Sequence, residues 1–179
     1  MNDLESLRYP IGRFEMPSII TDENVQEYIR TLEEFPTLLK KTVENFDDKK
    51  FGTPYRENGW TGQQVISHLA DAHSIAYAMF KRGLEENNLI LRPHNEPEKM
   101  DVSGNQSTTL HKALEVICHV HQCWSLDLHS LSDSELKINF FYPGAGRTIS
   151  LAEFLSIFSW HTKHHLGHIT GLKERMGWR

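Results

Sequence analysis

The C-terminal segment constrains the fold most, because it combines an apolar helical stripe with a cluster of histidines. The stretch from Ser150 to Glu153 fits a capping box, so a helix is predicted to begin there and to end near Gly177. At about 100° per residue, its apolar side chains form one inward stripe. The stripe consists of Phe154, Ile157, Phe158, Ile169 and Leu172. This helix is therefore expected to pack in a core.

Three earlier segments also show helical periodicity. The first covers residues 21–46, capped by Thr21 or Asp22, and Pro36 is expected to kink or break it midway. The second begins near residue 61 at another capping box and continues through residue 80, and the third spans roughly 109–130. Residues 138–149 predict a small hairpin with a glycine-bearing turn. The predicted fold class is all-α, a four-helix bundle with a small β-hairpin between helices three and four.

The bulk composition fits one soluble domain spanning residues 1–179. The chain is 39% hydrophobic and 24% charged, and its net charge is −5. That charge argues against nucleic acid or an anionic membrane as the main partner, and no apolar run is long enough to cross a bilayer. A cytoplasmic location is therefore expected. Residues 8–14 are predicted to form an extended arm, and the stretch from Asn87 to Gln106 a long loop.

Four of the eleven histidines lie in the last predicted helix. His161 and His165 are one turn apart and flank the middle of the apolar stripe, whereas His168 is off-centre and His164 lies at the edge, within reach of the surface or a partner. Buried imidazoles need partners for both nitrogens, so an inward pair favours a metal site over two hydrogen bonds to neighbouring helices. Thr162 follows His161 at the position where the zincin pattern H-E-x-x-H needs a glutamate, so a zincin-type protease is not expected.

A metal site needs at least a third ligand, and the spacing leaves three candidates open. His68 and His73 lie on different flanks of the second helix, and His121 lies within the apolar stripe of the third. His121 is a candidate ligand, a hydrogen-bond donor to a ligand, or a satisfied core residue. Asp71 near His68 is either an orienting hydrogen-bond partner or simply solvated.

Aromatic and basic residues before the second helix have two interpretations as well. Trp60 either lines a pocket or belongs to the core. Tyr55 and Arg56 either anchor an anionic substrate or make a structural loop contact.

Several short motifs, taken in order, resemble one known family. They are residues 8–14 (RYPIGRF), 53–56 (TPYR) leading to 59–61 (GWT), 68–73 (HLADAH), His121 with Trp124, and the stretch from Trp160 to Ile169. Together they resemble the DinB-like metalloprotein superfamily, in its YfiT-like branch of metal-dependent hydrolases, which also includes bacillithiol S-transferases.

The resemblance implies a four-helix bundle, often a homodimer, with three histidines binding one divalent metal ion, zinc or nickel. Matched position by position, the ligands are His68, His161 and His165. His73, His121 and His164 then become pocket residues or partners of the ligands.

Two reactions on a small-molecule substrate are consistent with such a site. Three neutral nitrogen ligands leave a coordination position open, so the metal can activate water for hydrolysis or hold a low-molecular-weight thiol as thiolate for transfer. The sequence offers no convincing general base, which slightly favours the thiol route. A protein that binds metal or ligand without turnover is the alternative from another class.

Overall fold

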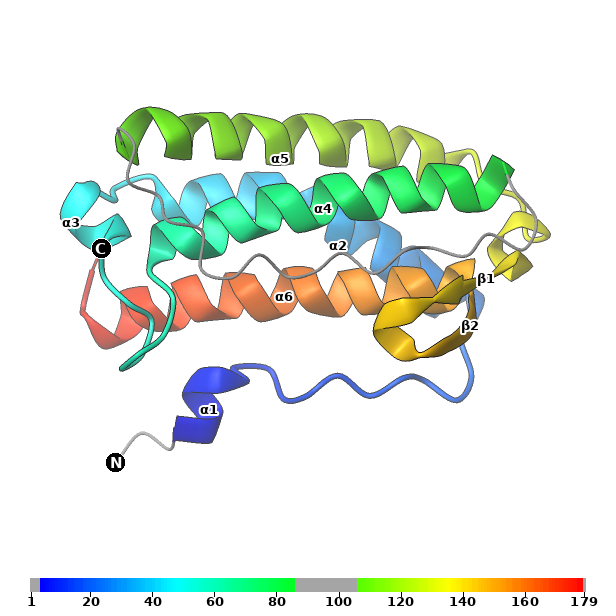
Figure 1. Cartoon of the computed structure of the whole chain (residues 1–179), viewed down its shortest axis with the longest axis horizontal. Helices are drawn as coiled ribbons and strands as arrows, with labels where there is room; N and C mark the ends of the chain where they lie inside the picture. Colours follow the sequence, from blue (N-terminus) through cyan, green and yellow to red (C-terminus); the bar gives the residue numbers. More distant parts are fainter. Residues whose placement is uncertain (1–3, 86–105, 179) are drawn as a thin grey trace.

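Four long helices build the part of the chain that this computed structural model describes, residues 4–85 and 106–178 (Figure 1). The long helices are α2 (Asp22–Val43), α4 (Gly62–Glu85), α5 (Gln106–His129) and α6 (Leu151–Arg175). The shorter elements are α1 (Leu4–Arg8), α3 (Asp48–Phe51), η1 (Glu135–Lys137), β1 (Asn139–Tyr142), η2 (Pro143–Ala145) and β2 (Arg147–Ser150). The predicted four-helix bundle with a hairpin between its last two helices is confirmed. The predicted loop from Asn87 lies outside the described residues up to residue 105, and Gln106 already belongs to α5.

The order of the helices around the bundle follows from their contacts. α2 packs against α5 and α6, and α4 packs against the same two helices, so α2 and α4 lie at opposite corners. Residues 9–21 form an irregular arm that runs along α6 and is preceded by α1 (Figure 1). The arm was predicted, but the short helix that ends at Arg8 was not. None of the helices that the structure describes combines the length and apolar character needed to span a bilayer.

The buried core divides into two apolar clusters, separated along the bundle by histidines. One cluster contains Leu32, Ala76, Phe80, Trp124, Phe154 and Phe158, among others. The second contains Phe35, Leu69, Ala70, Ile117 and Ile169, among others. On α4, α5 and α6, His73, His121 and His161 fall between residues of the first cluster and residues of the second. The bundle therefore has a polar layer in the middle of an otherwise apolar interior.

Pro36 does not break α2, which runs without interruption from Asp22 to Val43. A proline has no N–H, so it cannot donate the helical hydrogen bond to the carbonyl four residues earlier, here Leu32. His121 of α5 occupies that position instead, with its Nδ1 2.6 Å from the Leu32 carbonyl oxygen. The lost backbone bond is thus replaced by a bond between helices, and burial of Phe35 and Leu39 next to the proline holds the helix in place.

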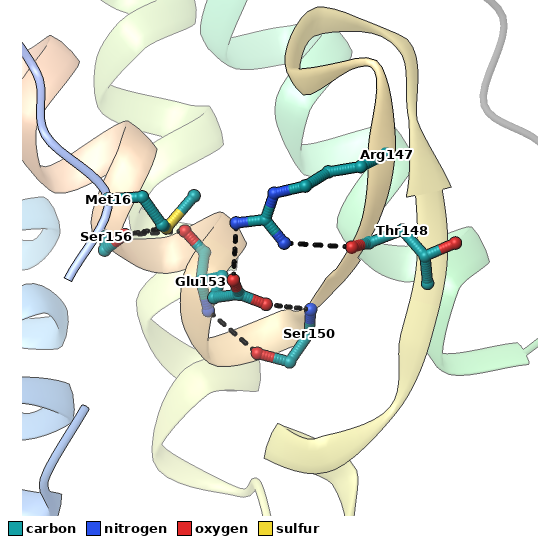
Figure 2. Close-up of polar contacts among 6 residues, drawn as sticks. All are labelled: Met16, Arg147, Thr148, Ser150, Glu153 and Ser156. Atoms are coloured by element: carbon teal, nitrogen blue, oxygen red, sulfur yellow. Dashed lines mark hydrogen bonds and ion pairs between the residues drawn. The ribbon is translucent and has the colours of Figure 1, made fainter. Parts of the chain in front are cut away.

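The start of α6 is fixed by a capping box at the end of the hairpin (Figure 2). Ser150 Oγ accepts from the Glu153 backbone N–H at 3.2 Å, and the Ser150 N–H donates to Glu153 Oε2 at 2.7 Å. Arg147, which pairs with Tyr142 across the hairpin, also binds Glu153 Oε1 at 2.7 Å. The predicted capping boxes of α4 and α6 are both confirmed, since Thr61 and Gln64 exchange the same two bonds.

Replacing Ser150 with alanine should destabilise the protein without altering the site chemistry. The Glu153 N–H would lose its acceptor, which costs about 1 kcal/mol at a helix N-terminus. Urea unfolding followed by circular dichroism measures the change in the free energy of unfolding. Ser18→Ala, at an exposed serine in the arm, is the control and should leave that free energy nearly unchanged. Equal stability of the Ser150→Ala variant and the wild type would contradict the assigned role of the cap.

Candidate metal centre

Three histidines from two adjacent helices meet beside the polar layer. His68 comes from α4, and His161 and His165 come from α6. One ring nitrogen from each lies within 4.8 Å of those of the other two. The ring centroids are 4.5 Å apart for His161 and His165 and 4.8 Å apart for His68 and His165. The structure therefore brings together the three residues that the family resemblance implied as ligands.

The spacing of these nitrogens fits a single divalent ion. His68 Nε2 and His161 Nε2 are 3.2 Å apart. Two nitrogens bound to one tetrahedral zinc ion at ordinary bond lengths lie about 3.3 Å apart. Burial also keeps the rings in the neutral form that metals bind, because it lowers the pKa of His161 to about 3 and that of His165 well below its usual value. Nearby imidazoles lower both pKa values further.

A second histidine group overlaps the first. One ring nitrogen from each of His164, His165 and His168 also lies within 4.8 Å of the others, and all three residues are buried. The two groups share His165, so proximity alone does not determine which three residues would hold an ion. The groups differ in their surroundings, because His164 and His168 are among the described residues that line the cavity beside the arm, whereas His68 and His161 are not.

His164, predicted to lie at the edge within reach of the surface or a partner, is buried beneath the N-terminal arm and lines a cavity there. Its side chain is only 8% exposed. Its ring stacks on Trp160 with centroids 4.4 Å apart and also contacts Tyr9 of the N-terminal arm, at 6.0 Å. Helical periodicity placed His164 at the boundary of the stripe, but it contained no information on the arm that covers this face of α6.

His73 and His121 lie outside the three-histidine group and are hydrogen-bonded to it in series. His73 Nε2 is 3.0 Å from His161 Nδ1, and His73 Nδ1 is 2.6 Å from His121 Nε2. Both side chains are fully buried. Burial lowers the pKa of His121 to about 4 and that of His73 well below its usual value. Both rings are therefore neutral at physiological pH, and each carries one N–H.

A cavity of about 320 Å³ opens beside His165. It is lined by residues of the arm, the loop before α4 and helix α6, namely Arg8, Tyr9, Tyr55, Arg56, Asn58, Trp60, His164, His165 and His168. Sequence reasoning named Tyr55, Arg56, Trp60 and His164, but missed Arg8, Tyr9 and Asn58 as cavity residues. The arm motif from Arg8 to Phe14 was the available signal for the first two.

Backbone bonds shape the loop that provides the other wall of this cavity. The Tyr55 N–H donates to the Trp60 carbonyl at 3.0 Å, which closes the loop. Gly59 sits against the Arg56 side chain, where an added Cβ would lie 2.6 Å from Arg56 Cγ. The loop therefore needs glycine at this close approach.

The loop side chains pack directly on the histidines. Tyr55 stacks on His168, with ring centroids 4.0 Å apart and planes at 18°. Trp60 contacts His68 at 4.8 Å and lies nearly parallel to the His165 ring at 6.2 Å. Asp71, predicted either to orient His68 or to be solvated, lies on α4 less than one turn after His68 and is half-buried.

Known proteins resemble this chain over nearly its whole length. A model of the DinB superfamily matches residues 31–169. The chain belongs to the DinB superfamily. A Bacillus subtilis (strain 168) protein named "Putative metal-dependent hydrolase YfiT" is 36% identical over 173 residues, which cover 97% of each chain. A Bacillus mycoides protein named a "Putative metal-dependent hydrolase" is 35% identical, over 98% of this chain and 100% of its own.

A solved structure extends the similarity to three dimensions. It is described as "YfiT from Bacillus subtilis is a probable metal-dependent hydrolase with an unusual four-helix bundle topology". It matches with a TM-score of 0.89 at 36% identity, covering 97% of this chain and 99% of its own. The DinB superfamily match runs from α2 to α6 and includes all the histidines of the centre. The arm lies outside that match.

The metal-free protein should lose stability as the pH falls from about 6.5 toward 5. Burial holds the pKa values of His73, His121 and His161 below those of the unfolded chain. The unfolded state therefore binds more protons in this window, and the free energy of unfolding falls by up to about 1.4 kcal/mol per pH unit for each ring. Urea unfolding of chelator-treated protein at pH 7.5, 6.5, 5.5 and 5.0 measures the slope. His119→Gln, at an exposed histidine of α5, should keep it, and a flat profile would contradict the prediction.

Proposed function

We propose that the protein is a metal-dependent hydrolase whose divalent ion is held by His68, His161 and His165. The observation that carries the proposal is the convergence of three imidazole nitrogens within 4.8 Å, beside a cavity of about 320 Å³. The names of its relatives in the DinB superfamily support the metal-dependent activity. Imidazole ligands suit zinc and nickel, and either ion is consistent with this ligand set.

Ligation by histidines alone determines the chemistry that the bound ion would supply. A divalent ion bound only by neutral nitrogens keeps its full charge, polarises a substrate carbonyl and lowers the pKa of water to near 7. Other residues of the protein hold the ligand side chains in place and shape the path by which a substrate reaches them. Trp60 packs across two of the three ligand rings and shields that side from water.

The cavity walls favour a small anionic substrate. Arg8 and Arg56 both line the cavity, and none of the described residues that line it is an aspartate or a glutamate. Arg56 Nε is buried and has no hydrogen-bond partner among the described residues, so a donor is available for a carboxylate or phosphate oxygen. Tyr55 lies below the Arg56 guanidinium, 5.4 Å from its central carbon, and supports it through a cation–π contact.

Metal content should separate the two overlapping histidine groups. His161→Ala removes a ligand of the proposed group only, so this variant should lose most of its bound zinc or nickel. His164→Ala removes a residue of the second group only and should retain its metal. His165 belongs to both groups, so its replacement would not discriminate. Metal analysis of the purified proteins, with circular dichroism as a check on folding, gives the answer. Loss on His164→Ala with retention on His161→Ala would assign the ion to the other group.

Hydrolysis should depend on the metal and on the charge of the substrate. Chelator treatment should abolish the cleavage of small aryl esters, and added Zn²⁺ or Ni²⁺ should restore it. For two esters that differ only in a carboxylate group, Arg56→Gln should raise KM for the anionic ester and leave KM for the neutral ester nearly unchanged. Cleavage that persists after chelation would overturn the proposal. Chelator-sensitive conjugation of a low-molecular-weight thiol without hydrolysis would instead support the S-transferase alternative.

A further inference from the structure

We infer that His121 and His73 fix the tautomer of His161 through a directed chain of hydrogen bonds that begins at the Leu32 carbonyl. In this tautomer Nε2 of His161 carries no proton, so its lone pair points into the candidate centre and can bind a cation. The inference rests on the proposed function for the cation itself, but the tautomer is a property of the metal-free protein. His121 and His73 are thus positioning residues, whose effect reaches the site through His161.

The series of hydrogen bonds begins at the Leu32 carbonyl, which has no helical N–H donor because residue 36 is proline. In a regular helix the Leu32 oxygen would accept from the N–H of residue 36, but proline has none. The oxygen is instead 2.6 Å from His121 Nδ1. A carbonyl oxygen can only accept, so His121 must carry its proton on Nδ1. A neutral imidazole carries one N–H, and therefore His121 Nε2 has a bare lone pair.

The direction of this first bond determines the next two. His73 Nδ1 lies 2.6 Å from His121 Nε2, so His73 must be the donor and its Nε2 is left bare. His73 Nε2 lies 3.0 Å from His161 Nδ1, so His161 donates in turn and its own Nε2 is bare. That nitrogen faces His68 Nε2 across 3.2 Å, within the proposed metal centre.

Burial makes the chain directional and stable. Reversing any bond would leave an N–H facing another N–H, or a carbonyl without a donor, in the bundle interior, and leaving such a group unsatisfied is unfavourable. Both ring nitrogens of His73, His121 and His161 have a partner. By contrast, His164, His165 and His168 each have a buried Nδ1 without a hydrogen-bond partner among the described residues.

These hydrogen bonds fix the orientation and tautomer of the rings and do not form a path for proton transfer. The series ends at a backbone carbonyl, which takes no proton at accessible pH, and not at a carboxylate or solvent. Phe35 contacts the rings of both His73 and His121, with centroids 5.7 and 5.1 Å away, and Trp124 lies 6.1 Å from His121. These contacts hold the rings in the orientation that the hydrogen bonds require.

The decisive experiment measures ring tautomers and metal affinity in the same protein. Two-bond ¹⁵N–¹H correlation spectra of the chelated, ¹⁵N-histidine-labelled full chain should show His161 protonated on Nδ1 and bare on Nε2. In His121→Phe, His73 loses its acceptor and should move its proton to Nε2, which forces His161 into the opposite tautomer. The affinity for Zn²⁺, measured by competition with a chromophoric chelator, should then fall about 10- to 100-fold.

Two further variants complete the test. His121→Gln provides an amide donor and acceptor, and it should recover most of the lost Zn²⁺ affinity. His119→Phe makes the same replacement at an exposed position of α5 and should match the wild type. A wild-type spectrum with His161 protonated on Nε2 would overturn the inference, even if His121→Phe did not fold. Unchanged Zn²⁺ affinity in a folded His121→Phe variant would overturn it as well.

The two proposals can fail separately. If His161→Ala binds Zn²⁺ as tightly as the wild type, the proposed metal centre is wrong. The ring spectra of the metal-free protein still decide whether the hydrogen-bond chain exists.

Discussion

The polar layer of His73, His121 and His161 in the middle of the bundle is the constraint on which the rest of the structure depends. A helical bundle of this length would ordinarily fill its centre with apolar side chains. Here the buried His73 and His121 and the half-buried His161 interrupt the two apolar clusters, and a ring nitrogen held away from water needs a partner. The partners come from all four long helices, so the relative rotation and height of the helices are limited by hydrogen-bond geometry as well as by packing. A site that requires fixed nitrogens benefits from such a frame.

Parts of the chain outside the bundle line the cavity beside the site. The N-terminal arm lies along α6, where the Arg8 carbonyl is 3.1 Å from His168 Nε2 and Phe14 packs against Trp160. The loop before α4 forms the opposite wall and is tied to the end of α6, because Arg175 donates to the Tyr55 carbonyl at 2.6 Å. The bundle holds the candidate ligands, while the arm and the loop supply the remaining residues around the cavity beside them.

Much of the fold was predictable because its signals are local in sequence. The capping boxes at Thr61 and Ser150 and the apolar periodicity define the long helices, and the inward pair His161 and His165 follows from the same periodicity. Local patterns could not choose among His68, His73 and His121, because that choice depends on how neighbouring helices are rotated. The family resemblance, rather than the spacing, singled out His68. The short helices α1 and α3 have too few residues to produce a periodic signal.

The role of Pro36 shows how a correct local rule can lead to the wrong structure. Proline does remove a helical hydrogen bond, but the freed Leu32 carbonyl is satisfied by a residue 89 positions away in the sequence, so α2 continues. Whether such an acceptor is used depends on a donor that only the tertiary structure brings near.

The two overlapping histidine groups can be distinguished by the same reasoning about partners. His161 Nδ1 is hydrogen-bonded to His73 within the polar layer, and His161 Nε2 faces His68 at the candidate centre. This arrangement is typical of a ligand that is oriented by its neighbours. His168 Nε2 faces the Arg8 carbonyl and must therefore be its protonated nitrogen, which leaves a buried Nδ1 lone pair without a partner among the described residues. His164 also has an unpartnered Nδ1, and both residues line the cavity. These two rings therefore border the cavity and are not part of the hydrogen-bonded layer. His165 lies between the two sides, because it belongs to both groups and lines the cavity.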